Sequence, residues 1–449
     1  MISLQILSHR NILQTKTHLT FPISFGPFNS ILQKRWKKPI DSAQTRLENR
    51  TRDTTLDKLM ANLKKLKIIL QIHQLMTDRK RGPFVSVQLM SRWTNVIGLN
   101  VTMGTFLRKY PHVFEVFTHP VRRNLCCRLT CKMRDLISEE EGVVKECELD
   151  AVRRVKKLLM MSNTGRLQVH ALRLIRRELG LPEDFRESIL GKFAGDFRLL
   201  DLETVELVDT HDDDDYANLG VAAVEKWREK EYTEKWLSEF ETRFAFPINF
   251  PTGYKIEAGF RGKLRNWQRL PYLKPYERKE VVRVRTCGGI ERFEKRAVGI
   301  IHELLNLTVE KMVEVERLAH FRKDYGMVVN VRELLLKHPG IFYISTKGTA
   351  QTVFLREAFS KGCLIEPNPI YVVRQKILDL MLLGCRNTRE LRCREVIKEG
   401  SDNVVGQVDR EIKKGSDNVV GTRDGDWAIS ILEGFGGGNP SDNLSQEFH

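Results

Sequence analysis

The chain of 449 residues is too long for a single small core, and 41% hydrophobic with 29% charged residues is typical of a soluble protein of two or three domains. No uninterrupted apolar stretch approaches the roughly 18 residues of a membrane-spanning helix, so we expect no membrane partner. The 74 Lys and Arg residues exceed the 58 Asp and Glu residues, and the formal charge of +16 favours a polyanionic partner without identifying it.

Residues 1–40 have the composition of an organelle transit peptide. They contain no Asp or Glu, six Lys or Arg residues and an apolar pattern from Ile2 to Leu13 that is compatible with an amphipathic helix. Because polar residues interrupt that pattern, organelle import is favoured over secretion. The segment has only four serines, which favours the mitochondrion over the chloroplast as the destination. A basic arm with no targeting role is the alternative interpretation.

Three segments of the chain share one layout, in which a glycine precedes a phenylalanine by 16 or 17 residues. The pairs are Gly98 with Phe114, Gly180 with Phe197, and Gly326 with Phe342. Each glycine ends a predicted helix, at about 86–97, 166–179 and 309–325. Leu or Met follows each glycine, as expected where glycine takes the left-handed conformation at a helix C-terminus. Such self-similarity indicates a repeated structural unit.

Each segment continues into a predicted β-hairpin and is preceded by one more helix. The hairpin strands are 113–117 with 125–130, 197–200 with 205–208, and 341–345 with 352–355. Three helices followed by a hairpin is the order of a winged helix, a relative of the helix-turn-helix. We therefore predict a helix-rich α+β fold with three winged-helix-like modules near 54–131, 151–209 and 290–357. Ordinary α+β packing units without a binding role are the alternative.

The regions outside these modules differ in composition. We predict a charged helix at 217–243 and a solvated loop at the acidic run 211–215. Residues 386–449 predict a disordered tail, in which a seven-residue sequence at 400–406 recurs at 415–421. None of the eight cysteines forms a CxxC pair, so free thiols are favoured over a zinc site.

The segment 255–285 combines ten Lys or Arg residues with aromatic rings and only three acidic residues. Single-stranded RNA is held by cations on its phosphates and by rings that stack on its bases. We therefore predict RNA contact by Lys255, Arg261, Lys263, Arg265, Trp267, Arg269, Tyr272, Lys274, Tyr276 and Arg278. Pro271 and Pro275 favour a structured surface loop over a helix. The competing interpretation is that the rings anchor the segment to a core and the cations form a solvated rim.

Several motifs occur in order along the chain. They are Glu225-Lys226-Trp227-Arg228-Glu229, Phe244-Ala245-Phe246-Pro247, Trp267-Gln268-Arg269-Leu270-Pro271-Tyr272 with Pro275-Tyr276-Glu277, and Lys337-His338-Pro339-Gly340-Ile341-Phe342-Tyr343. On these motifs, residues 50–385 resemble the plant organelle RNA recognition (PORR) domain. The resemblance implies a plant protein that is imported into mitochondria or chloroplasts, binds organellar group II intron RNA and promotes its splicing, with other splicing factors as candidate companions.

No catalytic motif stands out in the sequence. It has no phosphate-binding loop with its lysine, no nucleophile elbow and no HExxH motif. We therefore expect no enzymatic activity, no metal and no cofactor. Two other functions stay open: an organellar DNA-binding or transcription-associated factor, because winged helices commonly bind duplex DNA, and a nuclease.

Overall fold

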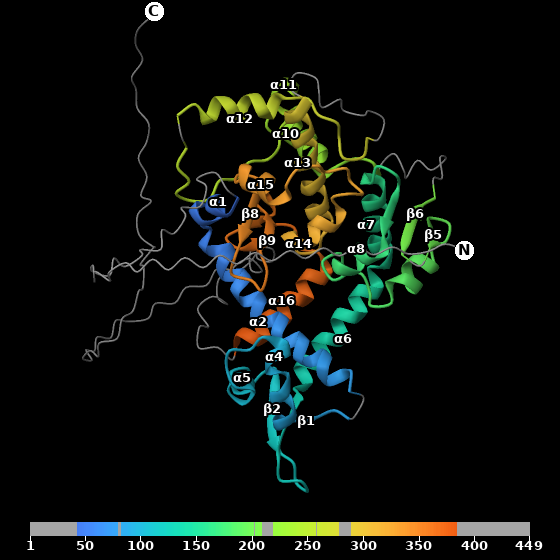
Figure 1. Ribbon diagram of the computed structural model, residues 1–449, viewed down its shortest axis with the longest axis vertical. Coiled ribbons are helices and arrows are strands. Elements are labelled where there is room, and N and C mark those ends of the chain that lie inside the picture. Colours follow the sequence, from blue (N-terminus) through green and yellow to red (C-terminus); the bar gives the residue numbers. More distant parts are fainter. Residues whose placement is uncertain are drawn as a thin grey trace, which may run out of the picture. The chain divides into compact units, whose positions relative to one another are not determined.

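The computed structural model describes residues 43–79, 82–201, 203–208, 219–256, 258–277 and 289–383 (Figure 1). Within these residues the chain is a helix-rich α+β protein whose strands form small antiparallel sheets. The predicted transit peptide, the acidic run at 211–215 and the tail from residue 386 lie outside them. No helix in the described ranges is long and apolar enough to cross a bilayer.

Three repeats have the same order of elements: a long helix, a short strand, short helices and a hairpin. The first repeat comprises α2 (Thr54–Thr77), β1 (Val85–Ser86), α3 (Val87–Met90), η1 (Ser91–Trp93), α4 (Thr94–Ile97), α5 (Met103–Lys109), β2 (Phe114–Thr118) and β3 (Leu125–Leu129). The second comprises α7 (Glu148–Met161), β4 (Arg166–Gln168), α8 (Val169–Leu174), η2 (Arg186–Gly191), β5 (Phe197–Asp201) and β6 (Thr204–Leu207). The third comprises α13 (Gly289–Leu307), β7 (Met312–Glu314), α14 (Val315–Leu318), η3 (Ala319–Phe321), α15 (Val331–Lys337), β8 (Phe342–Ser345) and β9 (Thr352–Leu355).

The three-stranded sheets of the repeats have the same topology, with the last strand in the centre: β1-β3-β2, β4-β6-β5 and β7-β9-β8. The predicted hairpins are confirmed to within one residue at most strand ends. The outer strands β1, β4 and β7 were not expected, because the sequence predicted helix from these positions onward. Their backbone groups pair with the hairpin edge, at Val85–Cys127, Leu167–Val205 and Val313–Val353. A partner that lies about 40 residues away leaves no local signal in the sequence.

The repeated glycines take the predicted left-handed conformation, but only Gly98 directly follows a helix, α4. The predicted helices 166–179 and 309–325 are instead a short strand and short helices, and Gly180 and Gly326 close the turns that follow them. Gly98, Gly180 and Gly326 have φ angles of +72°, +67° and +62°, in the left-handed region. The residue after each glycine donates its N–H to the carbonyl five positions earlier, at 2.9–3.0 Å. This bond satisfies a carbonyl that the turn would otherwise leave free.

Further elements connect and extend the repeats (Figure 1). The helix α6 (Cys131–Glu146) joins the first repeat to the second, and α1 (Ala43–Asn49) precedes the first. Between the second and third repeats lie α10 (Ala223–Glu234), α11 (Glu239–Thr242) and α12 (Phe260–Arg269). The third repeat is followed by η4 (Arg356–Ala358), β10 (Phe359–Ser360), β11 (Cys363–Leu364) and α16 (Pro369–Leu383).

The core has two parts. One is built by the second and third repeats with residues of the 223–276 region. The other joins the first repeat to α16, which packs against α6 and α2 and buries Ile370, Ile377 and Met381 there. Phe354 of β9 also belongs to this second cluster. The first repeat therefore completes its core with residues from the C-terminal end of the described chain.

Candidate nucleic-acid interface

The segment predicted to contact RNA contains the helix α12 rather than a continuous surface loop. The prolines that favoured a loop lie after the helix, which ends at Arg269. A proline beyond the last turn removes no helical hydrogen bond. Pro271 therefore limits the length of α12 but does not prevent the helix from forming. Gly259 precedes the helix with a φ of +76°, a turn that L side chains rarely adopt.

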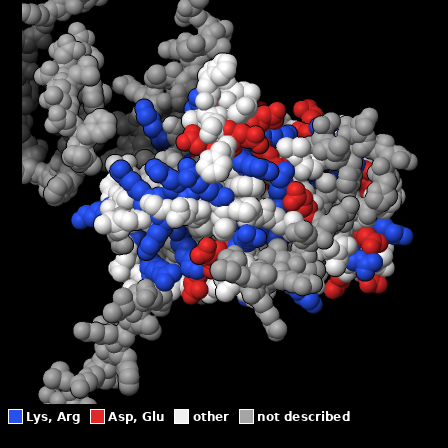
Figure 2. Space-filling view, turned by 90° about the horizontal axis from the view of Figure 1, so that it is seen from above, with Lys and Arg blue, Asp and Glu red and all other residues white. Residues whose placement is uncertain are grey.

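The helix α12 has one cationic and one apolar side. Arg261, Arg265 and Arg269 recur at four-residue spacing and are exposed, whereas Leu264 and Trp267 are half-buried. Lys263 is exposed at the border between the two sides. We call Arg261, Lys263, Arg265 and Arg269 the α12 cationic face; within the residues that the structure describes, none of the four is in an ion pair. Figure 2 shows Lys and Arg side chains gathered on this side of the molecule.

A buried lysine of α13 fixes the C-terminal end of α12. Lys295 has no exposed surface, and its Nζ donates to the carbonyl oxygens of Trp267, Gln268 and Leu270 at 2.8, 2.9 and 2.7 Å. It also lies 5.0 Å from the Trp267 ring centroid and 5.2 Å from that of Tyr272. Burial, with a smaller contribution from Arg228, lowers the pKa of Lys295 to about 7. The carbonyls at the end of α12 thus find their donors inside the protein.

Two further side chains of α13 hold the chain after α12. Arg296 donates to the carbonyl oxygen of Lys274 at 2.6 Å. Glu303, which is 1% exposed, accepts a 2.6 Å hydrogen bond from the Tyr276 hydroxyl and a 2.7 Å bond from the backbone N–H of Ala223. The same carboxylate therefore positions both the segment after α12 and the start of α10.

The three rings expected to stack on RNA bases are directed into the protein instead. Tyr272 is 8% exposed, and its hydroxyl accepts a 2.9 Å hydrogen bond from Arg228. The Tyr276 hydroxyl is bound to Glu303, and burial raises the pKa of both tyrosines. Trp267 packs between Phe246 and His338, with centroid distances of 5.6 and 4.5 Å. The placement of Tyr272 and Tyr276 corresponds to the core-anchor interpretation, whereas Trp267 stays half-buried.

The seven cations predicted to contact RNA divide into three sets. Lys255 is exposed, like the four residues of the α12 cationic face. Lys274 is exposed but paired with Glu225, with 2.7 Å between Nζ and Oε1. Arg278 lies outside the described residues. Five predicted cations are thus available to a phosphate backbone.

The sequence reasoning missed two kinds of residue. Lys295 and Glu303 are charged residues that lie among the apolar residues of the buried helix α13, and that contrast was the available signal. Trp236 and Phe240, between α10 and α12, are 91% and 69% exposed, and Arg269 lies 4.8 Å above the Phe240 ring. The sequence does not indicate that these two side chains are exposed, because the charged and apolar residues of the helix before them do not show which aromatic residues are buried.

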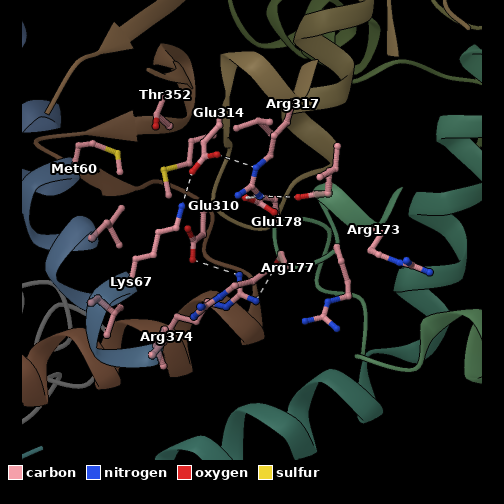
Figure 3. Close-up of a pocket in the computed structure, with 17 residues that line it drawn as sticks. Met60, Lys67, Arg173, Arg177, Glu178, Glu310, Glu314, Arg317, Thr352 and Arg374 are labelled. Atoms are coloured by element: carbon pink, nitrogen blue, oxygen red, sulfur yellow. Dashed lines mark hydrogen bonds and ion pairs between the residues drawn. The ribbon is translucent and has the colours of Figure 1, made fainter. Parts of the chain in front are cut away.

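A charged cavity of about 290 Å³ lies where the three repeats meet (Figure 3). Several of its charges form ion pairs: Lys67 pairs with Glu314 at 2.8 Å, and Arg317 pairs with Glu314 at 2.9 Å and with Glu178 at 2.5 Å. Arg374 completes the network through Glu310 at 3.3 Å. Because most of the cations that line it are already paired, this cavity joins the repeats and is a weaker candidate for an anion site. The described residues also contain no group of three or more His, Cys, Asp or Glu arranged to hold a metal ion.

A helix-rich α+β scaffold that holds unpaired cations on an anchored surface helix defines a class of proteins suited to polyanions. The chain belongs to the plant organelle RNA recognition domain family, whose model matches residues 51–386. It is 41% identical to Protein ROOT PRIMORDIUM DEFECTIVE 1 of Arabidopsis thaliana over 78% of this chain and 88% of that protein. It is 30% identical to Protein WHAT'S THIS FACTOR 1, chloroplastic, of Zea mays, over 74% of this chain and 66% of that protein.

A mitochondrial relative is also similar. Protein WHAT'S THIS FACTOR 9, mitochondrial, of Arabidopsis thaliana is 30% identical over 66% of this chain and 75% of that protein. The family is therefore shared between the two organelles. No solved structure matches the fold.

Proposed function

We propose that the chain binds single-stranded or irregular organellar RNA through the α12 cationic face and Lys255, and that it promotes group II intron splicing without breaking bonds itself. The observation that carries this proposal is the row of exposed, unpaired cations on a helix that Lys295 anchors. Membership in the plant organelle RNA recognition domain family supports RNA as the polyanion. The fixed helix presents its charges at constant spacing, so binding loses little conformational freedom.

The repeats give the RNA-binding proposal a structural frame. Their order of helix, strand, helices and hairpin, with the first strand beside the last, supports a winged-helix-like assignment. Because winged helices commonly bind duplex DNA, an organellar DNA-binding or transcription-associated factor is the rival function. Competition between intron RNA and duplex DNA of equal length decides between them; we expect the RNA to displace the DNA, and the reverse outcome would favour the rival.

The salt dependence of binding tests the α12 cationic face directly. For single strands, log K falls with log salt by about 0.7 per neutralised phosphate. The triple variant Arg261→Ala, Arg265→Ala, Arg269→Ala should therefore weaken RNA binding and reduce the slope by about 2. The control Lys132→Ala, Arg134→Ala, Lys145→Ala removes the same charge from exposed positions of α6. If both triple variants lose the same affinity and slope, net charge alone explains the binding, and α12 is not the interface.

The splicing role and the location follow as proposals. Relatives carry both chloroplastic and mitochondrial names, and we propose the mitochondrion, with the chloroplast as the alternative. Sequencing of RNA that co-purifies with the chain from each organelle should recover intron-containing transcripts from one of them. A knockout should then lack the corresponding spliced transcripts; intact splicing would leave binding without a splicing role.

The absence of catalysis is also a proposal that can be tested. Incubation of the purified chain with single-stranded RNA and magnesium should leave the RNA intact. Cleavage that depends on magnesium and on the protein would establish a nuclease instead.

A further inference from the structure

A small apolar pocket lies beside the α12 cationic face. Its volume is about 150 Å³. The lining side chains come from the segment before α12, from α12 itself and from the end of α15: Ile248, Phe250, Phe260, Leu264, Trp267 and His338. Ligand sites for drug-sized molecules typically have at least about 300 Å³. This pocket therefore has room for one planar ring system and not for a helix or a folded partner.

The walls of the pocket are held in place by packing. Phe250 stacks on Tyr254 with 4.8 Å between the ring centroids and meets Phe260 edge-to-face at 5.9 Å. At Gly340 a Cβ atom would lie 2.6 Å from Ile248 and 3.1 Å from Phe250, so the chain passes close against this wall. The backbone N–H of Asn249 also donates to the Gly340 carbonyl at 2.7 Å. The pocket is thus formed before any ligand enters.

Polar groups surround the apolar walls in an arrangement that suits a nucleobase. Lys263 lines the pocket and belongs to the α12 cationic face, so a phosphate bound there lies next to the opening. The buried His338 Nε2 has no hydrogen-bond partner among the described residues. Burial, together with Lys337 and Lys295, lowers the pKa of His338 to about 4, and the ring is neutral at pH 7. A neutral imidazole offers either a donor or an acceptor to the edge of a base.

We propose that this pocket takes one unstacked nucleobase of single-stranded RNA whose phosphates lie on the α12 cationic face. The inference rests on the proposed RNA binding and adds a site for the base. Apolar and aromatic walls replace the stacking that the base loses when it leaves its neighbours. The cations beside the opening favour a nucleic acid over an apolar peptide side chain as the occupant.

The test compares RNA with and without bases. Binding of the full chain to a 12-nucleotide oligouridylate and to an abasic strand of equal length and charge is measured by fluorescence anisotropy. The variant Phe260→Ala should lose about 5- to 150-fold in affinity for the oligouridylate, the range expected for one stacked base. Its affinity for the abasic strand and its salt slope should not change, because the cations remain in place.

Two further variants make the result decisive. Phe84→Ala is the matched control: Phe84 is half-buried like Phe260 and likewise contacts two aromatic rings, but it lies beside β1. It should leave the oligouridylate affinity unchanged. Leu264→Trp fills the pocket without removing a wall and should lower the same affinity; circular dichroism verifies that each variant is folded.

The outcomes separate the pocket from the proposed function. If the parent chain binds neither strand, the proposed RNA binding fails as a whole. If the parent binds with the expected salt slope but Phe260→Ala and Leu264→Trp keep full affinity for the oligouridylate, the base site is overturned and RNA binding stands. Cross-links from 4-thiouridine to residues 248–267 would support the pocket, and cross-links confined to other segments would contradict it.

Discussion

At the scale of single residues, a buried lysine and a half-buried histidine meet at one tryptophan. Lys295 contacts the Trp267 ring and the carbonyls that end α12, and His338 packs on the same ring. Neither residue faces solvent as a phosphate ligand would. Lys295 keeps the helix of exposed cations in a fixed position, and His338 lines the pocket beside that helix.

Replacement of the buried lysine should loosen α12. We expect Lys295→Met to lower the free energy of unfolding by about 2–4 kcal/mol, because three buried carbonyls lose their donor. Urea denaturation measures the loss, and hydrogen exchange should show faster exchange at 260–270. The control Lys226→Met, at an exposed position of α10, should stay within about 0.5 kcal/mol of the parent. Equal stability of the two variants would contradict the anchoring role.

The stability of the protein should depend on His338 in acid. Its pKa is about 4 in the folded chain and about 6.5 in an unfolded one. Between these values the unfolded chain binds the extra proton, so stability falls as pH falls from 6.5 towards 4, by about 3 kcal/mol. Denaturation of the parent and of His338→Phe across this range measures the difference. Parallel pH profiles would show that His338 does not carry this dependence.

At the scale of elements, the repeated glycines Gly98, Gly180 and Gly326 have the same backbone conformation but different surroundings. A Cβ on Gly180 would lie 2.7 Å from Ile370 and 3.0 Å from Val309, whereas a Cβ on Gly98 would meet no atom within 4 Å. Gly180 therefore serves both the turn and the packing of the third repeat and α16 against the second repeat. Gly98 serves the turn alone.

This difference predicts unequal effects of the same substitution. Gly98→Ala should cost about 1 kcal/mol of stability for the left-handed conformation. Gly180→Ala should cost about 1–3 kcal/mol more, because its methyl group overpacks the joint. Thermal and urea denaturation of both variants provide the comparison. Equal losses would mean that the joint relaxes without penalty.

The elements that could be predicted from the sequence are those with local signals. The glycine turns and the hairpins depend on neighbouring residues, and both were confirmed. The outer strands of the sheets and the burial of Tyr272 depend on partners that are distant in sequence, such as Cys127 for Val85 and Arg228 for Tyr272, and could not be read locally. Pro271 and Pro275 were expected to favour a loop over a helix, but both follow α12 and leave it intact. The exposure of the cations on α12 could therefore be predicted, and the orientation of the rings could not.

At the scale of the whole molecule, Arg374 of α16 connects the second and third repeats to α6, the helix that joins the first repeat to the second. It is 5% exposed and binds Glu140 of α6 at 2.7 Å, Glu310 at 3.3 Å and the carbonyl oxygen of Arg177 at 3.0 Å. Glu140 precedes the second repeat, Arg177 lies within it, and Glu310 lies in the third repeat. A cation with so many buried partners makes their stabilities interdependent.

Loss of this cation should uncouple the repeats. Arg374→Met should destabilise the fold by about 3–5 kcal/mol, because it leaves buried carboxylates without a partner. Lys376→Met removes the exposed pair with Glu139, 2.6 Å long and also between α16 and α6, and should cost less than about 1 kcal/mol. Calorimetry should show one transition for the parent and separated transitions for Arg374→Met. A single, unshifted transition in that variant would refute the coupling.

The packing of α16 on α2 and α6 sets the order in which the protein can mature. A nascent chain usually folds its N-terminal domain first, while later residues are still being made. Here the first repeat is synthesised early but lacks Ile370, Ile377 and Met381 until residue 383 has left the ribosome. We therefore expect the apolar surface of the first repeat to stay exposed for most of translation, until α16 has been made.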